Sequence, residues 1–186
     1  NAYKRTNSYF DNSPLASSGL PSKDEMILLQ PWKDMLPKEV FARTYQVPTT
    51  DGTGTPRKNL KKAKKMLEKE GWSIQNGKLE KNGKEFVFEF LIVSPSLEKI
   101  GLAFKENLKT LGITMNIRTV DSSQYQNRLL SYDFDMISHT WRISLSPGNE
   151  QQFYWGSEVG KEDGSKNYAG IDSPVVDFLI EKLIGA

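Results

Sequence analysis

The sequence of 186 residues contains no cysteine and a single histidine, His139. Disulfide bonds, zinc–thiolate sites and thiol nucleophiles are therefore excluded, although the absence of cysteine does not fix the cellular compartment. One histidine without cysteine also disfavours a bare nickel ion, which binds to imidazole and thiolate ligands. We therefore expect neither a cofactor nor a bound metal.

Long apolar runs and an excess of charge of one sign are also missing. No stretch approaches the ~20 apolar residues that a membrane-spanning helix needs, and the longest apolar run, within 86–93, is interrupted by Glu89. The 25 basic and 23 acidic residues give a net charge of +2. Because so small a charge creates a weak field, it does not indicate binding to nucleic acid or to an anionic membrane.

Hydrophobic periodicity predicts that strands and helices alternate along the chain. Two Asn-Gly pairs, at 76–77 and 82–83, indicate tight hairpin turns. The order of the later elements, with short connections, indicates right-handed crossovers and a mainly parallel sheet. We therefore predict an α/β (mixed α+β) fold with helices flanking the sheet. The expected helices are 22–29, 59–71, 96–111, 122–131 and 174–184, and the expected strands are 78–80, 85–93, 113–117 and 134–140.

A run of basic residues opens the predicted helix 59–71 and is the strongest charge feature of the sequence. Its functional interpretation is contact with phosphate. However, these lysines surround a single apolar stripe and are followed by Glu68 and Glu70. A solvated outer helix face explains this pattern, so we interpret the run as structural. The basic residues are Arg57, Lys58, Lys61, Lys62, Lys64 and Lys65.

His139 lies near the carboxyl end of a predicted parallel strand, where open α/β sheets bind their ligands. A catalytic histidine would need a nucleophile and an orienting carboxylate, and no nucleophile motif is present. Asp133 and Asp135 lie at the amino end of the same strand, so we interpret them as turn and edge residues. A hydrolase that uses these two acids with His139 stays open as an alternative. Trp141 and the aromatic residues 153–155 follow the strand. Core packing would account for some of them, and so dense a group beside an irregular loop also suits a ligand pocket.

Four blocks of the sequence, in order, resemble the C-terminal lobe of the family 5 extracellular solute-binding proteins, the dipeptide- and oligopeptide-binding group. They are 59–72 (NLKKAKKMLEKEGW), 86–93 with the later turn 110–121 (TLGITMNIRTVD), 133–141 (DFDMISHTW) and 164–171 (GSKNYAGI). The segments 3–13 (YKRTNSYFDNS) and 145–155 (LSPGNEQQFYW) are similar to the YejA-type branch of that family.

The resemblance implies a lobe of a type II periplasmic binding protein. A full member has two lobes and a hinge, closes on a peptide or peptide-like ligand in the periplasm, and delivers it to the transmembrane permease subunits of an ABC importer. We therefore expect residues 1–186 to be a single domain of a longer monomeric protein that carries a signal peptide, with Asn1-Ala2 as an expression scar. We expect a binding protein and not an enzyme, with no nucleic-acid partner. A non-peptide solute, such as a sugar, an opine or a metal chelate, stays open as an alternative ligand.

The residues that we expect to contact the ligand follow the strand 134–140. Its backbone would pair with an extended peptide as an added strand. Trp141 would form an apolar wall, and Arg142 would bind a carboxylate or phosphate of the ligand. The predicted site residues are His139, Thr140, Trp141, Arg142, Ser144, Asn149 and Tyr168.

Ser144 departs from the pattern that the resemblance implies. Peptide-binding members of the family have an Asp three residues after the strand-end Trp, and this Asp pairs with the free amino terminus of the ligand. A serine hydroxyl cannot supply the opposite charge that a buried ammonium group needs. We therefore predict a ligand whose amino end is blocked or modified.

Overall fold

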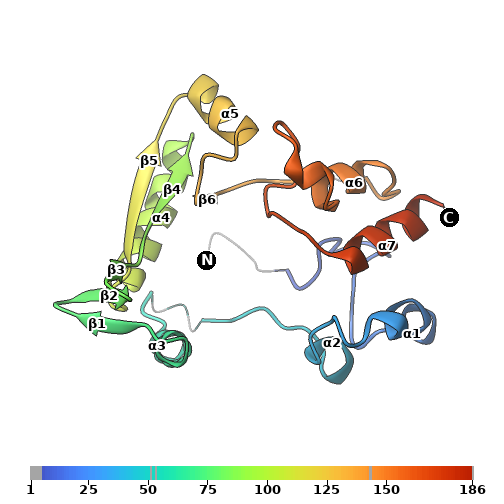
Figure 1. Ribbon diagram of the computed structural model, residues 1–186, viewed down its shortest axis with the longest axis horizontal. Helices are drawn as coiled ribbons and strands as arrows, with labels where there is room; N and C mark the ends of the chain where they lie inside the picture. Colours follow the sequence, from blue (N-terminus) through green and yellow to red (C-terminus); the bar gives the residue numbers. More distant parts are fainter. Residues whose placement is uncertain (1–5, 51, 53, 143, 186) are drawn as a thin grey trace. The chain divides into compact units, whose positions relative to one another are not determined.

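The computed structural model describes residues 6–50, 52, 54–142 and 144–185 (Figure 1). The interpretation of Asn1-Ala2 as an expression scar falls outside these residues. The chain divides into two compact units: unit 1 contains the residues up to Val47 and from Trp141 onward, and unit 2 contains Pro48–Thr140. The expectation of a single domain over 1–186 stays a prediction.

A parallel sheet forms the centre of unit 2, as the sequence predicted (Figure 1). It contains β4 (Val87–Ile92), β5 (Thr114–Thr119) and β6 (Met136–Ile137) in the order β5-β4-β6, and both pairs are parallel. Helix α4 (Pro95–Lys109) joins β4 to β5, and α5 (Ser122–Leu130) joins β5 to β6.

Helix α4 packs on one face of this sheet around Phe90, Ile92 and Met115, which are 4%, 1% and 0% exposed. Gly101 lies close to the sheet, because a Cβ at this position would lie 3.0 Å from Cδ1 of Ile117. Of the apolar residues along the predicted helix 96–111, Leu97 and Leu108 pack against this core. Ile100 and Phe104, by contrast, are 44% and 43% exposed.

A three-stranded antiparallel sheet precedes β4, and its two turns are the predicted Asn-Gly pairs. The strands are β1 (Ser73–Gln75), β2 (Lys78–Lys81) and β3 (Lys84–Glu85). Asn76 and Asn82 have φ of 50° and 55°, and the glycine after each also has positive φ, which is the backbone that such two-residue turns require.

Helix α3 (Arg57–Lys69) packs against this smaller sheet through an apolar cluster that contains Leu79 and Leu111. The helix begins two residues before Asn59, the first residue of the predicted range. Pro56 occupies the N-cap position, and the amide of Asn59 donates to the carbonyl of Thr49 at 2.9 Å.

Strand β6 is much shorter than the predicted strand 134–140. At its amino end, the Asp135 carboxylate accepts the backbone N–H of Glu89 at 2.8 Å. A side chain thus replaces the backbone partner before Met136, where backbone pairing with β4 begins. The pairing ends at Ile137, so His139 and Thr140 lie in an irregular segment beyond the strand.

All regular elements in the described part of unit 1 are helices. They are α1 (Lys23–Leu29), η1 (Gln30–Trp32), α2 (Glu39–Ala42), α6 (Glu150–Trp155), η2 (Val159–Lys161) and α7 (Pro174–Ile184). Helix α1 begins as predicted, because Ser22 and Glu25 form a reciprocal capping box. Trp32 packs on Phe178 of α7, with ring centroids 5.4 Å apart. Across both units, no helix in the described residues is long and apolar enough to cross a membrane.

Candidate ligand-contact site

Five aromatic side chains of unit 1, centred on the half-buried Trp141, form what we call the aromatic cluster. The Trp141 ring lies nearly parallel to Tyr168, with centroids 5.5 Å apart and an interplanar angle of 20°. Its centroid is 4.5 Å from that of Tyr154 and 5.4 Å from that of Trp155. Tyr9 then contacts Trp155 edge to face at 5.3 Å. Phe153, which the sequence grouped with these residues, is 58% exposed.

Helix α6 supplies two members of the cluster, and hydrogen bonds fix its first turn. Glu150 Oε1 accepts the backbone N–H of Gly148 at 3.0 Å and the amide of Gln151 at 3.2 Å. The hydrogen bond from Gly148 is the main cause that holds the pKa of Glu150 below its ordinary value. The buried Gln151 in turn accepts the indole N–H of Trp155 at 3.1 Å. This chain of bonds sets the orientation of the Trp155 ring.

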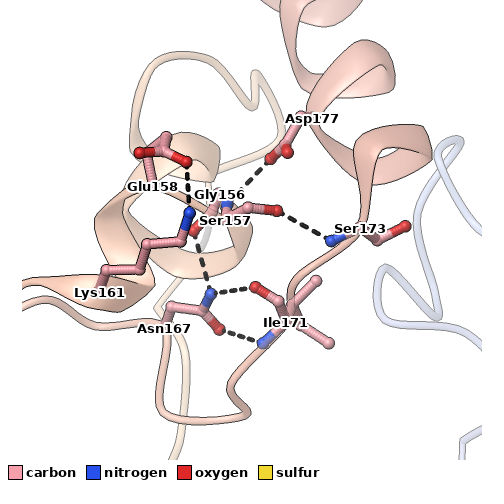
Figure 2. A network of polar contacts seen from close by, with 8 residues as sticks. All are labelled: Gly156, Ser157, Glu158, Lys161, Asn167, Ile171, Ser173 and Asp177. Atoms are coloured by element: carbon pink, nitrogen blue, oxygen red, sulfur yellow. Dashed lines mark hydrogen bonds and ion pairs between the residues drawn. The ribbon is translucent and has the colours of Figure 1, made fainter.

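A buried polar network holds the segment that carries Tyr168 (Figure 2). Asn167 is 0% exposed, and its amide donates to the carbonyls of Gly156 at 3.1 Å and Ile171 at 2.8 Å. Its side-chain oxygen accepts the N–H of Ile171 at 2.9 Å. The end of α6 and the loop before α7 are therefore joined through a single side chain.

A second set of bonds in Figure 2 joins the end of α6 to the start of α7. The backbone N–H of Ser157 donates to Asp177 of α7 at 2.9 Å, and the Ser157 hydroxyl accepts the N–H of Ser173 at 2.8 Å. Beside them, Lys161 and Glu158 form an exposed ion pair at 2.6 Å.

The other predicted site residues are all exposed. His139 and Thr140 end unit 2, whereas Arg142 follows Trp141 in unit 1. Asn149 occupies the N-cap position of α6, with no side-chain hydrogen bond to the cap. The structure thus brings Trp141 and Tyr168 into direct contact within unit 1.

The Ser144 hydroxyl closes a local turn. It donates to the carbonyl of Ser146 at 2.8 Å and accepts the N–H of the same residue at 3.2 Å. Because the single hydroxyl proton of Ser144 is donated within this turn, the hydroxyl can only accept a hydrogen bond from any further partner.

Asp133 and Asp135 hold α5 and β6 to the central strand. Arg128 of α5 lies 2.9 Å from the Asp133 carboxylate and 2.8 Å from that of Glu89 on β4. With the bond from Glu89 to Asp135, these contacts support the interpretation of both acids as turn and edge residues.

Neither of two hollows in unit 2 is lined by a predicted site residue. One, of about 810 Å³, is lined by Thr49, Thr50 and residues 55–59, and the other, of about 230 Å³, lies between α3 and β1. In the described residues, no group of three or more His, Asp or Glu side chains is arranged to hold a metal ion.

The family model of the bacterial extracellular solute-binding proteins, family 5 Middle, matches residues 27–163. The chain belongs to this family. It is 44% identical over 187 residues to the peptidoglycan-binding protein YepA of Agrobacterium fabrum, covering 100% of this chain and 30% of that protein. It is 42% identical over 186 residues to the probable peptide-binding protein YejA of the same organism, covering 99% of this chain and 30% of that protein.

A solved structure shows the same fold. The oligopeptide-binding protein AppA from Bacillus subtilis, in complex with a nonapeptide, matches with a TM-score of 0.58 and 30% identity. The match covers 66% of this chain and 25% of AppA. The predicted α/β lobe of a type II periplasmic binding protein and the resemblance to the YejA-type branch are thus confirmed. The chain spans less than a third of the length of each of these relatives.

Two features near Trp141 were not among the predicted site residues. Tyr154 and Trp155 were noticed as aromatic but lie in a helix, α6, that the sequence did not predict. Asn167 directly precedes Tyr168 and was noticed only as part of a family motif. An asparagine in a polar stretch predicts a turn, so no pattern in the sequence indicates its complete burial.

Proposed function

We propose that the longer protein that contains this chain is the periplasmic substrate-binding component of an ABC importer. It binds peptides, delivers them to the transmembrane permease subunits, acts as a monomer and catalyses no reaction on them. Membership of the solute-binding family supports the class of function. Similarity to AppA, solved with a nonapeptide, and to a probable peptide-binding protein supports peptides as the ligand.

The aromatic cluster carries this proposal within the chain. Trp141 and Tyr168 lie nearly parallel, and because each is only half-buried, their aromatic faces stay partly exposed. Such faces bind varied apolar side chains and peptide planes without demanding one partner, which suits a protein that accepts many peptides. In this proposal the irregular segment 138–140 pairs with the ligand backbone, and Arg142 binds a ligand carboxylate.

We further propose that the amino end of the ligand is blocked. Ser144 carries no charge, and its proton is used in the bond to Ser146. It therefore accepts an N–H from an acylated amino end, but it does not neutralise an ammonium group. The relative named as a peptidoglycan-binding protein supports this view. Peptides of peptidoglycan are joined through their amino ends to a sugar acid by an amide bond, so their amino end has no free α-amine.

The test uses the full-length protein, purified, unfolded to release any ligand, and refolded. It is incubated with a pool of synthetic tetrapeptides, half of them N-acetylated, and with a muramidase digest of peptidoglycan. Mass spectrometry then identifies what the protein retains. We expect intact peptides or peptide-bearing fragments. Retention of sugars without peptide, or cleavage products that vanish in a His139→Ala variant, would instead support a sugar binder or a hydrolase.

A further inference from the structure

The amide of Asn167 has only one orientation that satisfies its surroundings. Both of its N–H groups have carbonyl acceptors, on Gly156 and Ile171, and its oxygen has the Ile171 N–H as donor. The opposite orientation would place the side-chain oxygen against two carbonyl oxygens and the NH2 group against an N–H. Because the side chain is 0% exposed, water cannot compensate for either loss.

The space around this amide is equally restricted. A Cβ at Gly160 of η2 would lie 2.7 Å from the Asn167 side-chain nitrogen, closer than real Cβ contacts are found. Gly160 therefore leaves just enough room for the amide, and any side chain at that position presses on Asn167 first.

The backbone of Asn167 is held at the same point. Its N–H donates to the Ser165 hydroxyl at 3.3 Å, and its carbonyl accepts the N–H of Gly170 at 3.0 Å, which closes a turn around Tyr168. Tyr168 follows directly, and its ring lies 5.5 Å from Trp141. The side chain and the backbone at position 167 together fix the residue that packs on Trp141.

We infer that Asn167 is a positioning residue that holds Tyr168 against Trp141 and so shapes the aromatic face that contacts the ligand. The contact with ligand rests on the proposed function, whereas the effect on Trp141 does not. Asn167→Asp is the informative change, because it keeps the shape of the side chain and removes both donors. Facing two carbonyls, the new oxygen repels them, and the turn that carries Tyr168 moves.

The experiment uses full-length protein labelled with 5-fluorotryptophan, in which ¹⁹F resonances are assigned by replacing each Trp in turn. Tyr168→Leu gives the position of the Trp141 resonance without the tyrosine ring. In Asn167→Asp we expect the Trp141 resonance to move most of the way to that position. The resonances of Trp32 and Trp72 should stay in place, which shows that both units remain folded. If Asn167→Asp unfolds the protein, Gly160→Ala displaces the same amide without removing its donors and should move the Trp141 resonance in the same direction.

A Trp141 resonance that stays at its wild-type position in folded Asn167→Asp and Gly160→Ala protein overturns the inference. A change that is equally large in a Tyr168→Leu background also overturns it, because Asn167 would then act by another route. The ligand step is read separately, by titrating N-acetyl-tetraalanine and the peptidoglycan digest. We expect Asn167→Asp to raise the Kd about fivefold, or about 1 kcal/mol. If neither probe affects Trp141 in the wild type, the proposed function fails while the positioning effect stands.

Discussion

The carboxylate of Asp135 accepts the backbone N–H of Glu89 at 2.8 Å, which adds a side-chain hydrogen bond to the two-residue pairing of β4 with β6. Strand β6 would otherwise depend on Met136 and Ile137 alone. The exposed Asp135 thus supplies a hydrogen bond at the start of the segment that leads to His139 and Trp141.

Removing that acceptor should loosen β6 locally. In Asp135→Ala we expect the amide of Glu89 to exchange with deuterium about five- to tenfold faster. The lost hydrogen bond is worth about 1 kcal/mol, below the charge-assisted range, because solvent screens the exposed Asp135 carboxylate. Asp135→Asn keeps an oxygen acceptor and should show a smaller effect. Exchange of the Glu89 amide is measured by NMR, with the amide of Leu91 as internal control. Equal acceleration at both amides would indicate that the whole sheet opens instead.

Arg128 should matter more to the stability of unit 2 than an exposed ion pair does. Its guanidinium lies 2.8 Å from Glu89 and 2.9 Å from Asp133, and its side chain is 20% exposed. We expect Arg128→Met to lower the opening free energy of β4, measured by hydrogen exchange, by about 1 to 3 kcal/mol, since Glu89 loses its partner. The matched control is Lys161→Met, whose exposed pair with Glu158 should contribute about 0 to 0.5 kcal/mol to unit 1. Comparable losses in both variants would contradict this ranking.

Glu150 should make stability depend on pH in the acid range. Hydrogen bonds, first of all from Gly148, hold its pKa below the ordinary 4.5. A lowered folded-state pKa contributes stability that is present above the unfolded pKa and is lost as pH falls through the folded value. Thermal midpoints measured between about pH 6 and pH 3 should therefore fall more steeply for the wild type than for Glu150→Gln. Parallel curves would show that the capping bonds of Glu150 do not contribute.

Two tryptophans distinguish a ligand contact from core packing. Trp141 lies in the aromatic cluster, whereas Trp72 stacks on Phe86 in unit 2 at 4.9 Å. We expect both Trp141→Leu and Trp72→Leu to lower the thermal midpoint, because each loses ring contacts. Only Trp141→Leu should weaken peptide binding by full-length protein, by about 1 to 3 kcal/mol in calorimetry. A Trp141 variant with unchanged affinity would place this residue in the core alone.

Ser144 is tested with matched peptides that have a free or an acetylated amino end. The full-length wild type should bind the acetylated peptide at least as tightly in calorimetry, because position 144 offers no negative charge. Ser144→Asp should shift the preference toward the free amine by about 1.5 to 3 kcal/mol, the range for a charge-assisted hydrogen bond. Ser144→Ala controls for the loss of the local turn with Ser146. A wild-type preference of about tenfold or more for the free amine would show that another acid, such as Glu150, binds it.

Most of the fold could be predicted from the sequence where local sequence signals agree with the observed burial. In strand β4, Phe88, Phe90 and Ile92 recur at every second position, as expected of a strand. Ser22 is the N-cap of helix α1, and Gly71 follows the end of helix α3 with a positive φ. The exposure of Ile100 and Phe104 on α4 was not predictable, because it depends on how Gly101 approaches Ile117 across the core. Helix α6 has only six residues, too few to show a helical period.

The aromatic residues of the candidate site could be predicted from the sequence, but the hydrogen bonds that hold them could not. Trp141 and Tyr168 were chosen separately, and nothing in the sequence indicated that their rings stack. Tertiary hydrogen bonds join residues such as Asn167 and Gly156 across eleven positions, and no periodic pattern encodes such partners. The turn closed by Ser144 is local, but the sequence does not show that the hydroxyl proton of Ser144 is donated to the carbonyl of Ser146.

The two Asn-Gly turns around β2 also determine how the protein ages. When glycine follows asparagine, the next backbone nitrogen can attack the side-chain carbonyl carbon and expel ammonia. Water then opens the succinimide ring that forms, which gives aspartate or isoaspartate. Isoaspartate lengthens the main chain by one methylene, which a two-residue turn such as that of Asn76 or Asn82 cannot absorb without shifting its strands. We therefore expect deamidation, found by peptide mapping of stored protein, to begin in this hairpin and to loosen the covering of Leu79 first.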